Sequence, residues 1–301
     1  MRLIIGSRGS QLALWQANWV KDQLSCQGHA VEIRIIKTTG DKMQNVALTQ
    51  SGTKGLFIKE IEEALLEGSI DLAVHSMKDL PTDQPAGLAV VAVPEREDAR
   101  DVFIAREGKP FAELPPGSRV GTGSLRRQSQ LRRLRTDLEI VPMRGNLDTR
   151  LRKLGRGDCD ALVLAAAGVH RLGVRDRITA YFAPDEICPA VGQGALAIEI
   201  REDSEKVAEA VKLLDHPATH RAVRAERTML RRLGGGCQVP IAAHAISEDG
   251  QLRLLGVIAN LDGSKLIRAT ASAPPTEPDA LGVCVADDLL RQGARKILES
   301  L

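Results

Sequence analysis

Aromatic residues are scarce in this 301-residue sequence, which has four Phe, two Trp and one Tyr. Modules that bind nucleic acid by stacking bases on aromatic side chains are therefore not expected. The 41 basic and 39 acidic residues give a net charge of only +2, so overall charge does not draw the protein to nucleic acid or to a membrane surface. The hydrophobic core has to be built from Leu, Ile, Val and Ala.

Paired cysteines and long apolar runs are also missing. The five cysteines are an odd number, lie far apart and form no CxxC pair, which predicts reduced thiols with neither a disulfide framework nor a metal site. No apolar run approaches the roughly 18 residues that a membrane-spanning helix needs. The N-terminus resembles neither a signal peptide nor a transit peptide. We expect a cytoplasmic protein with no membrane partner.

Strand and helix signals alternate through the first two thirds of the chain. Short apolar strands are predicted at residues 3–5, 31–36, 71–74, 102–105, 119–121, 138–141, 161–165 and 195–200. Helices are predicted at residues 10–24, 53–67, 125–134, 147–154 and 204–214. This alternation predicts two α/β blocks with mostly parallel sheets and covering helices.

The last third has a different pattern. A helix at 218–233 precedes three strands at 239–247, 251–260 and 265–272, with Asp-Gly hairpin turns between them, and a helix at 279–299 follows. This is an α+β module with a three-stranded antiparallel sheet. We expect domain 1 at 1–95 plus 195–215, domain 2 at 96–194 and domain 3 at 216–301. A domain that the chain leaves and re-enters predicts a cleft beside it, with the two crossing segments as a hinge.

Three turns between a predicted strand and a predicted helix carry arginine. Residues 119–152 contain nine Arg, no Lys and three acidic residues. Helix starts and guanidinium groups both bind carboxylates, so the predicted ligand is a polyanion with several carboxylates. Ordinary capped turns with surface arginines are the alternative, and nucleic-acid phosphate is a competing ligand that the scarce aromatics disfavour. The polar residues of these turns are Arg8, Ser10, Thr122, Ser124, Arg126, Arg127, Arg144 and Arg150.

A second kind of chemistry is indicated where the apolar strand 71–74 ends. Lys78 and Asp79 follow that strand, and ligand sites in α/β sheets lie at the carboxyl ends of strands. The two residues are candidates for an acid/base pair, in which the carboxylate stabilises a developing cation and moves a proton. A salt-bridged loop is the alternative.

The loop after the helix at 218–233 presents a thiol. Three glycines at 234–236 precede Cys237, and such a loop allows a ligand to approach the backbone closely. The sequence offers no obvious nearby His as a base, which points to covalent tethering rather than acyl transfer. The other four cysteines are expected to be buried and inert.

The motifs together resemble one family, porphobilinogen deaminase, also called hydroxymethylbilane synthase. The matching segments run in family order over nearly the whole chain, at 6–16, 52–66, 71–81, 121–131, 144–151, 164–173, 189–199 and 234–240. The resemblance implies an enzyme that joins four porphobilinogen molecules head to tail with loss of ammonia and then releases hydroxymethylbilane by hydrolysis. It also implies two domains like periplasmic binding proteins with a cleft between them, followed by the α+β domain.

The resemblance assigns roles to individual residues. Cys237 would carry a dipyrromethane cofactor as a thioether, and Asp79 would be the catalytic carboxylate with Lys78 beside it. The residues expected to hold the cofactor are Ser76, Lys78, Thr122, Ser124, Arg126, Arg127, Arg144 and Arg150. Those expected to bind porphobilinogen are Arg8, Ser10, Phe57, Arg144, Arg150, Arg171 and Gln193, the last in the hinge segment.

Two positions depart from the family pattern. Gly123 stands where relatives often have Ser, and His170 stands where Lys is frequent. We expect a monomer with a small-molecule substrate and no nucleic-acid partner. The alternative functions are a non-catalytic anion-binding protein of periplasmic-binding type and, ranked last, an Arg-rich RNA binder.

Overall fold

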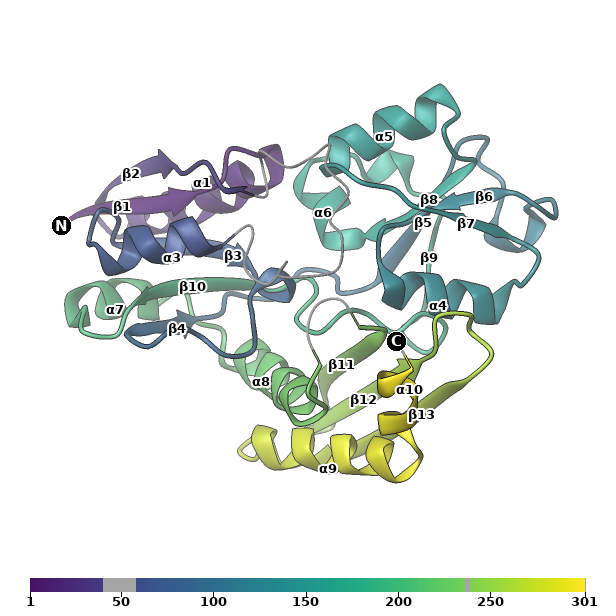
Figure 1. Ribbon diagram of the computed structural model, residues 1–301. Coiled ribbons are helices and arrows are strands. Elements are labelled where there is room, and N and C mark those ends of the chain that lie inside the picture. The colour runs from purple at the N-terminus through teal and green to yellow at the C-terminus, as the bar shows by residue number, and fades with distance from the viewer. Residues whose placement is uncertain (40–57, 236–238, 301) are drawn as a thin grey trace. The chain divides into compact units, whose positions relative to one another are not determined.

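The computed structural model describes residues 1–39, 58–235 and 239–300. The chain divides into two compact units (Figure 1), of which unit 1 is Met1–Arg96 with Ala195–His220 and unit 2 is Glu97–Gly194 with Arg221–Leu301. The chain thus leaves unit 1 once and re-enters it. The separation of residues 216–301 as a third domain, with the boundaries given above, stays a prediction.

Unit 1 is built on a five-stranded sheet with the order β2-β1-β3-β10-β4. β1 is parallel to its neighbours β2 and β3, whereas β10 is antiparallel to β3 and β4. Thus β1, β2, β3 and β4 run in one direction, as expected of a mostly parallel sheet, and β10, from the segment that re-enters the unit, runs against them. The strands are β1 (Arg2–Ser7), β2 (Ala30–Ile35), β3 (Leu72–Ser76), β4 (Leu88–Ala92) and β10 (Leu196–Arg201).

Helices cover both faces of this sheet. On one face α1 (Gln11–Cys26) and α7 (Glu205–Lys212) pack their apolar residues against alternate residues of β1, β3 and β10. On the other face α3 (Lys59–Leu66) buries Ile61 and Leu65 against Ala73. Neighbouring side chains of a strand point to opposite faces, so β3 packs Leu72 and Val74 into one helix layer and Ala73 into the other and is buried on both faces.

The first sheet of unit 2 repeats the design, with the order β7-β6-β8-β5-β9. β6 is parallel to β7 and β8, and β5 is antiparallel to β8 and β9. Its strands are β5 (Asp101–Ala105), β6 (Arg119–Gly121), β7 (Glu139–Val141), β8 (Ala161–Ala165) and β9 (Ala180–Tyr181). Its helices are α4 (Leu125–Leu134), α5 (Leu147–Arg156) and α6 (Ala166–Arg171), with the 3-10 turns η2 (Phe111–Glu113) and η3 (Arg175–Arg177).

Three of the seven aromatic residues of the chain pack in the core of this sheet. Phe103, Phe111 and Phe182 meet edge to face, with ring centroids 5.2–6.2 Å apart. They lie on the face that α4 covers through Leu131, while α5 covers the other face through Leu154. Phe103 and Phe182 are buried and Phe111 is partly buried, so these rings stabilise the core.

The second sheet of unit 2 is antiparallel, with the order β11-β12-β13, as predicted. Its strands are β11 (Ile241–Glu248), β12 (Gln251–Ala259) and β13 (Leu266–Ala273), and the helices near it are α8 (Pro217–Arg232), α9 (Pro278–Arg291) and α10 (Ala294–Glu299). The first hairpin turn has positive φ at Asp249 and Gly250, as a tight two-residue turn requires. Its apolar face packs on α8 and α9.

Some elements differ from the sequence-based expectation, and part of one predicted helix is not described. The single helix predicted at 279–299 is divided at Gly293, whose φ of 100° is left-handed and ends α9 before α10 begins. Strands β4 and β9 are additional to the predicted set. The N-terminal part of the helix predicted at 53–67 lies outside the described residues. Among the described residues, no helix combines the length and apolarity needed to cross a membrane.

Candidate active site

In unit 1 the carboxyl ends of β1 and β3 are neighbours, because the two strands are parallel and adjacent. β1 leads into Arg8 and then Ser10, whose Oγ accepts a hydrogen bond from Ala13 N (3.3 Å) and caps α1. Nε2 of the buried Gln16 donates to Oγ of Ser76 at the end of β3 (2.8 Å). The predicted residues Arg8, Ser10 and Ser76 therefore gather at one sheet edge beside a helix N-terminus, where anions are favoured.

The candidate acid/base pair lies directly after β3, on the one-turn 3-10 helix η1 (Met77–Asp79). The N–H of buried Met77 donates to the carbonyl of Ala195 (3.0 Å), and buried Leu80 closes the turn through its N–H to Met77 O (3.2 Å). Between these two anchors Lys78 is half-buried and Asp79 is exposed. The turn thus fixes its backbone against the sheet and leaves the Asp79 side chain exposed.

In unit 2 the carboxyl ends of β6, β7 and β8 share one edge for the same reason. β6 runs into buried Thr122, whose Oγ1 accepts from Ser124 N (3.2 Å), and Ser124 Oγ caps α4 by accepting from Arg127 N (3.4 Å). β7 is followed by Arg144. Nε of Arg150, on α5, donates to the Gly145 carbonyl (2.8 Å). The structure therefore brings the hydroxyls and the guanidinium groups of this predicted set to one edge of the unit 2 sheet.

Gly123 has a local explanation in the backbone. A Cβ at this position would lie 2.9 Å from the carbonyl oxygen of Met143, closer than real Cβ atoms normally come. A serine here would require the two strand-to-helix turns to move apart. The glycine at position 123 is therefore explained by the close packing of the turns that carry Thr122 and Arg144.

Arg126 and Arg127 are both buried and share one carboxylate. Arg126 Nη1 lies 2.8 Å from Asp101 Oδ2, and Arg127 Nη2 lies 2.7 Å from Asp101 Oδ1. Nη1 of Arg126 also donates to the Cys188 carbonyl (2.6 Å), and Nη1 of Arg127 to the Val163 carbonyl (3.1 Å). Two guanidinium groups against one carboxylate leave an excess positive charge in the interior of unit 2.

Gln193 and Arg171 hold the segment that returns toward unit 1. Nε2 of Gln193 donates to the Ala99 carbonyl (2.7 Å) and to Asp101 Oδ1 (2.8 Å), and Nη2 of Arg171 donates to the Gly194 carbonyl (2.7 Å). The two crossing segments lie side by side, since Glu97 N donates to Gly194 O (3.3 Å). Burial lowers the pKa of Arg171 to about 10, so its guanidinium stays charged at neutral pH.

His170, the second departure from the family pattern, lies between two partners in unit 2. Its Nδ1 is 3.0 Å from Glu97 Oε1 and its Nε2 is 2.8 Å from the Tyr181 hydroxyl. The Arg100 guanidinium lies over the Tyr181 ring, 4.3 Å from its centroid. The imidazole therefore belongs to a local network at the first crossing segment.

Two predicted site residues, Phe57 and Cys237, lie outside the described residues. Of the other cysteines, Cys159 and Cys188 are buried, as predicted, but Cys26 and Cys284 are exposed, so the expectation of burial was wrong for these two. Both are on helix positions that face solvent. Sequence reasoning also missed Asp101, and its only signal was an acidic residue at the start of an otherwise apolar strand.

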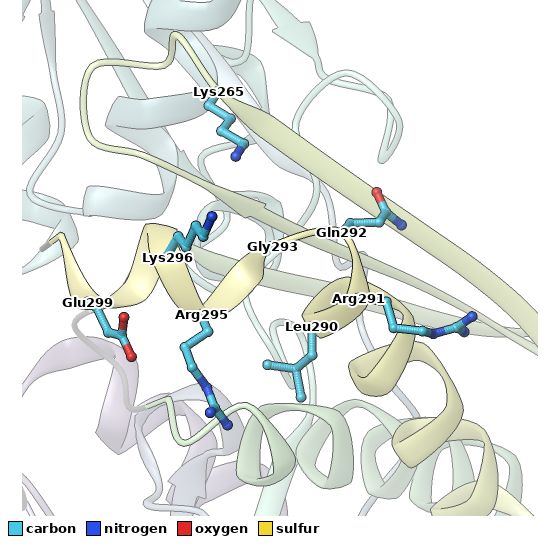
Figure 2. A pocket seen from close by; sticks show the side chains of 8 residues that line it. All are labelled: Lys265, Leu290, Arg291, Gln292, Gly293, Arg295, Lys296 and Glu299. Atoms are coloured by element: carbon cyan, nitrogen blue, oxygen red, sulfur yellow. The ribbon is translucent and has the colours of Figure 1, made fainter.

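An open hollow of about 540 Å³ lies where α9 gives way to α10 in unit 2. Figure 2 shows basic side chains around Gly293, with Leu290 and Glu299 at the same rim. These basic groups are exposed, as solvated lysines and arginines usually are. The hollow contains none of the predicted site residues, and we assign no ligand to it. Its lining is Lys265, Leu290, Arg291, Gln292, Gly293, Arg295, Lys296 and Glu299.

Two family models and several known proteins are similar to this chain. The family model "Porphobilinogen deaminase, dipyromethane cofactor binding domain" matches residues 3–209, and the model of the C-terminal domain of the same family matches residues 220–291. A solved periplasmic binding protein of Salmonella typhimurium with high arginine specificity is a distant likeness, 14% identical over 71% of this chain and 91% of that chain, with a TM-score of 0.39.

Curated relatives match over the full length. The porphobilinogen deaminase of Pelobacter propionicus is 53% identical over 100% of this chain and 97% of its own length. That of Syntrophobacter fumaroxidans is 52% identical over 99% and 97%, and that of Geobacter sulfurreducens is 53% identical over 99% and 94%. The chain belongs to the porphobilinogen deaminase family.

Proposed function

We propose that this chain joins four porphobilinogen molecules head to tail, releases ammonia at each step and frees hydroxymethylbilane by hydrolysis. The observation that carries the proposal is the exposed carboxylate of Asp79, held at the end of β3 by buried neighbours. The matched family model names a dipyrromethane cofactor-binding domain. A catalytic carboxylate and a cofactor domain favour this transferase over a non-catalytic anion-binding protein.

Asp79 is assigned the central catalytic role. When the bond between the aminomethyl carbon and the nitrogen of porphobilinogen breaks, ammonia leaves and the methylene carbon carries positive charge shared with the pyrrole ring. A carboxylate at that position stabilises the cation and can accept the proton that the attacking pyrrole carbon loses when the carbon–carbon bond forms. Lys78, the neighbouring residue on η1, supplies a positive charge that can hold a substrate or cofactor carboxylate beside it.

The arginine-bearing turns are assigned to the carboxylates of the growing chain. Porphobilinogen has two carboxylates, so negative charge accumulates with every added unit. Guanidinium groups bind carboxylates in a planar, two-pronged way. We assign substrate binding to Arg8, Ser10, Phe57, Arg144, Arg150, Arg171 and Gln193.

The residues of unit 2 fit a dipyrromethane that carries carboxylates. Nε of Arg126 and Nε of Arg127 are buried and have no hydrogen-bond partner among the described residues. Among the described ion pairs Asp101 is the one carboxylate paired with both side chains, and we propose that they can bind a further anion. Thr122 and Ser124 offer hydroxyls at the same turn, and Arg144 and Arg150 are the other unit 2 members of the proposed set. From unit 1 the proposed set includes Ser76 and Lys78. When bound through Cys237, the group supplies the pyrrole carbon to which substrate is joined.

The proposal also covers the cellular compartment and the oligomeric state of the enzyme. The four cysteines that the structure describes are free thiols, a state that a reducing compartment maintains. We propose that the protein acts in the cytoplasm as a monomer, with porphobilinogen as its substrate.

The role of Asp79 is tested by the variant Asp79→Asn. We expect kcat for porphobilinogen consumption to fall by about 100-fold or more, the size of effect seen when one preorganised electrostatic group is removed, while circular dichroism stays unchanged. Asp83→Asn, which changes another exposed carboxylate in the following loop, should stay close to wild type. Near-normal turnover by Asp79→Asn would contradict the assignment.

The tethering residue is tested by intact-mass measurement of the purified protein. The wild-type mass should exceed that of the bare chain by the bound dipyrromethane, and Cys237→Ser should have the mass of the bare chain with serine. Cys26→Ser, at an exposed helix position, should keep the extra mass. A wild-type protein with the mass of the bare chain would argue against a covalent cofactor.

A further inference from the structure

Glu199, a fully buried acid of β10, lies between two polar side chains that come from either side of the Asp79 loop. Its Oε2 is 3.1 Å from Nε2 of His75, and its Oε1 accepts a hydrogen bond from Nε2 of Gln84 (3.2 Å). His75 is on β3 just before the loop, and Gln84 follows the loop. One carboxylate therefore contacts both ends of the segment that carries Lys78 and Asp79.

The sheet register explains why these groups meet. β10 is antiparallel to β3, with Ala197 opposite His75 and Glu199 opposite Ala73. Since every second residue of a strand points to the same face, His75 and Glu199 share the face that α3 covers. The ladder continues past the strand, because Met77 N donates to Ala195 O. The start of the loop is thus fixed to β10 twice, through backbone and through side chain.

We infer that Glu199 is a positioning residue, which fixes the base of the Asp79 loop by holding His75 before it and Gln84 after it. Glu199 is 0% exposed and its carboxylate contacts His75 and Gln84, so we assign it a role that acts through the loop. The inference rests on the proposed role of Asp79. Catalytic groups have to be held close to their productive geometry, and a displacement of 1 Å can cost roughly 100-fold in rate.

A buried carboxylate needs partners that offset the cost of removing it from water. His75, 5% exposed, and Gln84 supply one hydrogen bond to each oxygen of Glu199. A further carboxyl, that of Glu62 on α3, faces the pair, and burial together with the charge of Glu199 raises the pKa of Glu62. A second carboxyl beside the His75–Glu199 pair would favour a non-polar replacement of this buried polar set if stability alone were at stake. The retained polar contacts therefore point to placement of the loop.

The test compares purified holoenzymes that remove one contact each, His75→Ala and Gln84→Ala, with His75→Gln, whose amide can still donate to Glu199. The cofactor-loaded fraction is counted by intact mass, and kcat and KM for porphobilinogen are referred to it. Ile200→Ala is the matched control, because Ile200 is buried next to Glu199 on β10 but belongs to the core on the opposite face. Gln84 is only partly buried, so Gln84→Ala gives a result even where His75→Ala folds poorly.

We expect each alanine variant to lose roughly ten- to 100-fold in kcat, as a displaced catalytic group does, with KM within about twofold of wild type. His75→Gln should recover most of the rate, and Ile200→Ala should lose stability but not kcat. Wild-type kcat in both alanine variants, beside an inactive Asp79→Asn, overturns the inference and leaves the proposed function standing. An equal loss of kcat in Ile200→Ala also overturns it. An active Asp79→Asn overturns the proposed role of Asp79 and the inference with it.

Discussion

The guanidinium of Arg127 donates to Oδ1 of Asp101 across 2.7 Å, with both side chains in the interior of unit 2. Burial by itself would raise the pKa of Asp101, but the charges of Arg126 and Arg127 outweigh it and hold that pKa well below its usual range. Asp101 is therefore the fixed negative charge that makes two adjacent buried arginines possible at the start of α4.

Asp101→Asn is the first prediction. The substitution removes the only carboxylate paired with Arg126 and Arg127 in the described ion pairs. We therefore expect the free energy of unfolding to fall by about 3–5 kcal/mol, the usual cost of breaking a buried ion pair by removing one partner. Urea unfolding at pH 7 measures it. Asp148→Asn, which removes an exposed pair with Arg152, should cost less than about 1 kcal/mol.

The same variant has a pH signature. Because the folded pKa of Asp101 lies below its unfolded value, its ion pairs add stability above about pH 4, and that stability is lost as the pH falls further. The difference in the free energy of unfolding between wild type and Asp101→Asn should therefore be largest at neutral pH and should decrease below pH 4. If this difference in the free energy of unfolding stayed constant down to pH 2, the ion pairs of Asp101 with Arg126 and Arg127 would not be what stabilises unit 2.

The second prediction concerns Glu62→Gln, which we expect to stabilise the protein, whereas Asp101→Asn destabilises it. Burial and the negative charge of Glu199 raise the pKa of Glu62 above its usual value. The folded state then binds the proton more tightly than the unfolded state, so this group destabilises the protein as the pH rises above about 4.5. The amide removes that effect.

Thermal melts across pH check this second prediction. Glu62→Gln should melt at a higher temperature than wild type at pH 7–8, and the difference should shrink toward pH 4. Glu63→Gln, on the exposed face of the same helix, controls for the change of net charge. A variant that is less stable than wild type at pH 8 would show that the Glu62 carboxylate has a stabilising partner.

Local patterns were enough to predict some parts of this fold and not others. The apolar strands and the Ser10 and Ser124 helix starts follow from neighbouring residues, and parallel neighbours then bring their turns to one sheet edge. The direction of β10 and the partner of the buried arginines could not be predicted in that way. Asp101 meets Arg127 through a fold contact that spans 26 positions, and Glu199 meets His75 across 124.

Thiol reactivity is the third prediction. Burial raises the pKa of Cys159, to about 11, and that of Cys188 still further, so neither forms much thiolate at pH 8. Iodoacetamide on the native protein should modify the exposed Cys26 and Cys284 and leave the two buried cysteines unmodified until denaturant is added. Peptide mass spectrometry reads out each site. Rapid native labelling of Cys188 would contradict its burial against Ala242 and Val257.

The packing of α8 on α9 gives the fourth prediction, through a glycine in the middle of α9. A Cβ at Gly282 would lie 2.5 Å from the carbonyl oxygen of Ala225 and 3.0 Å from Met229 N. Backbone atoms of a neighbouring helix cannot turn aside as a side chain can. Gly282→Ala should therefore force the two helices apart, at a cost of about 1–3 kcal/mol or more.

Gly155, in α5, is the matched control for Gly282, because a Cβ there meets no atom within 4 Å. Gly155→Ala should stabilise the protein by up to about 1 kcal/mol, since alanine favours the helix over glycine. In urea, the free energy of unfolding of Gly282→Ala should thus be lower than that of wild type, and that of Gly155→Ala should be higher. Equal stabilisation by both alanines would show that α8 and α9 are farther apart than the structure has them, because only a wider spacing leaves room for the methyl group.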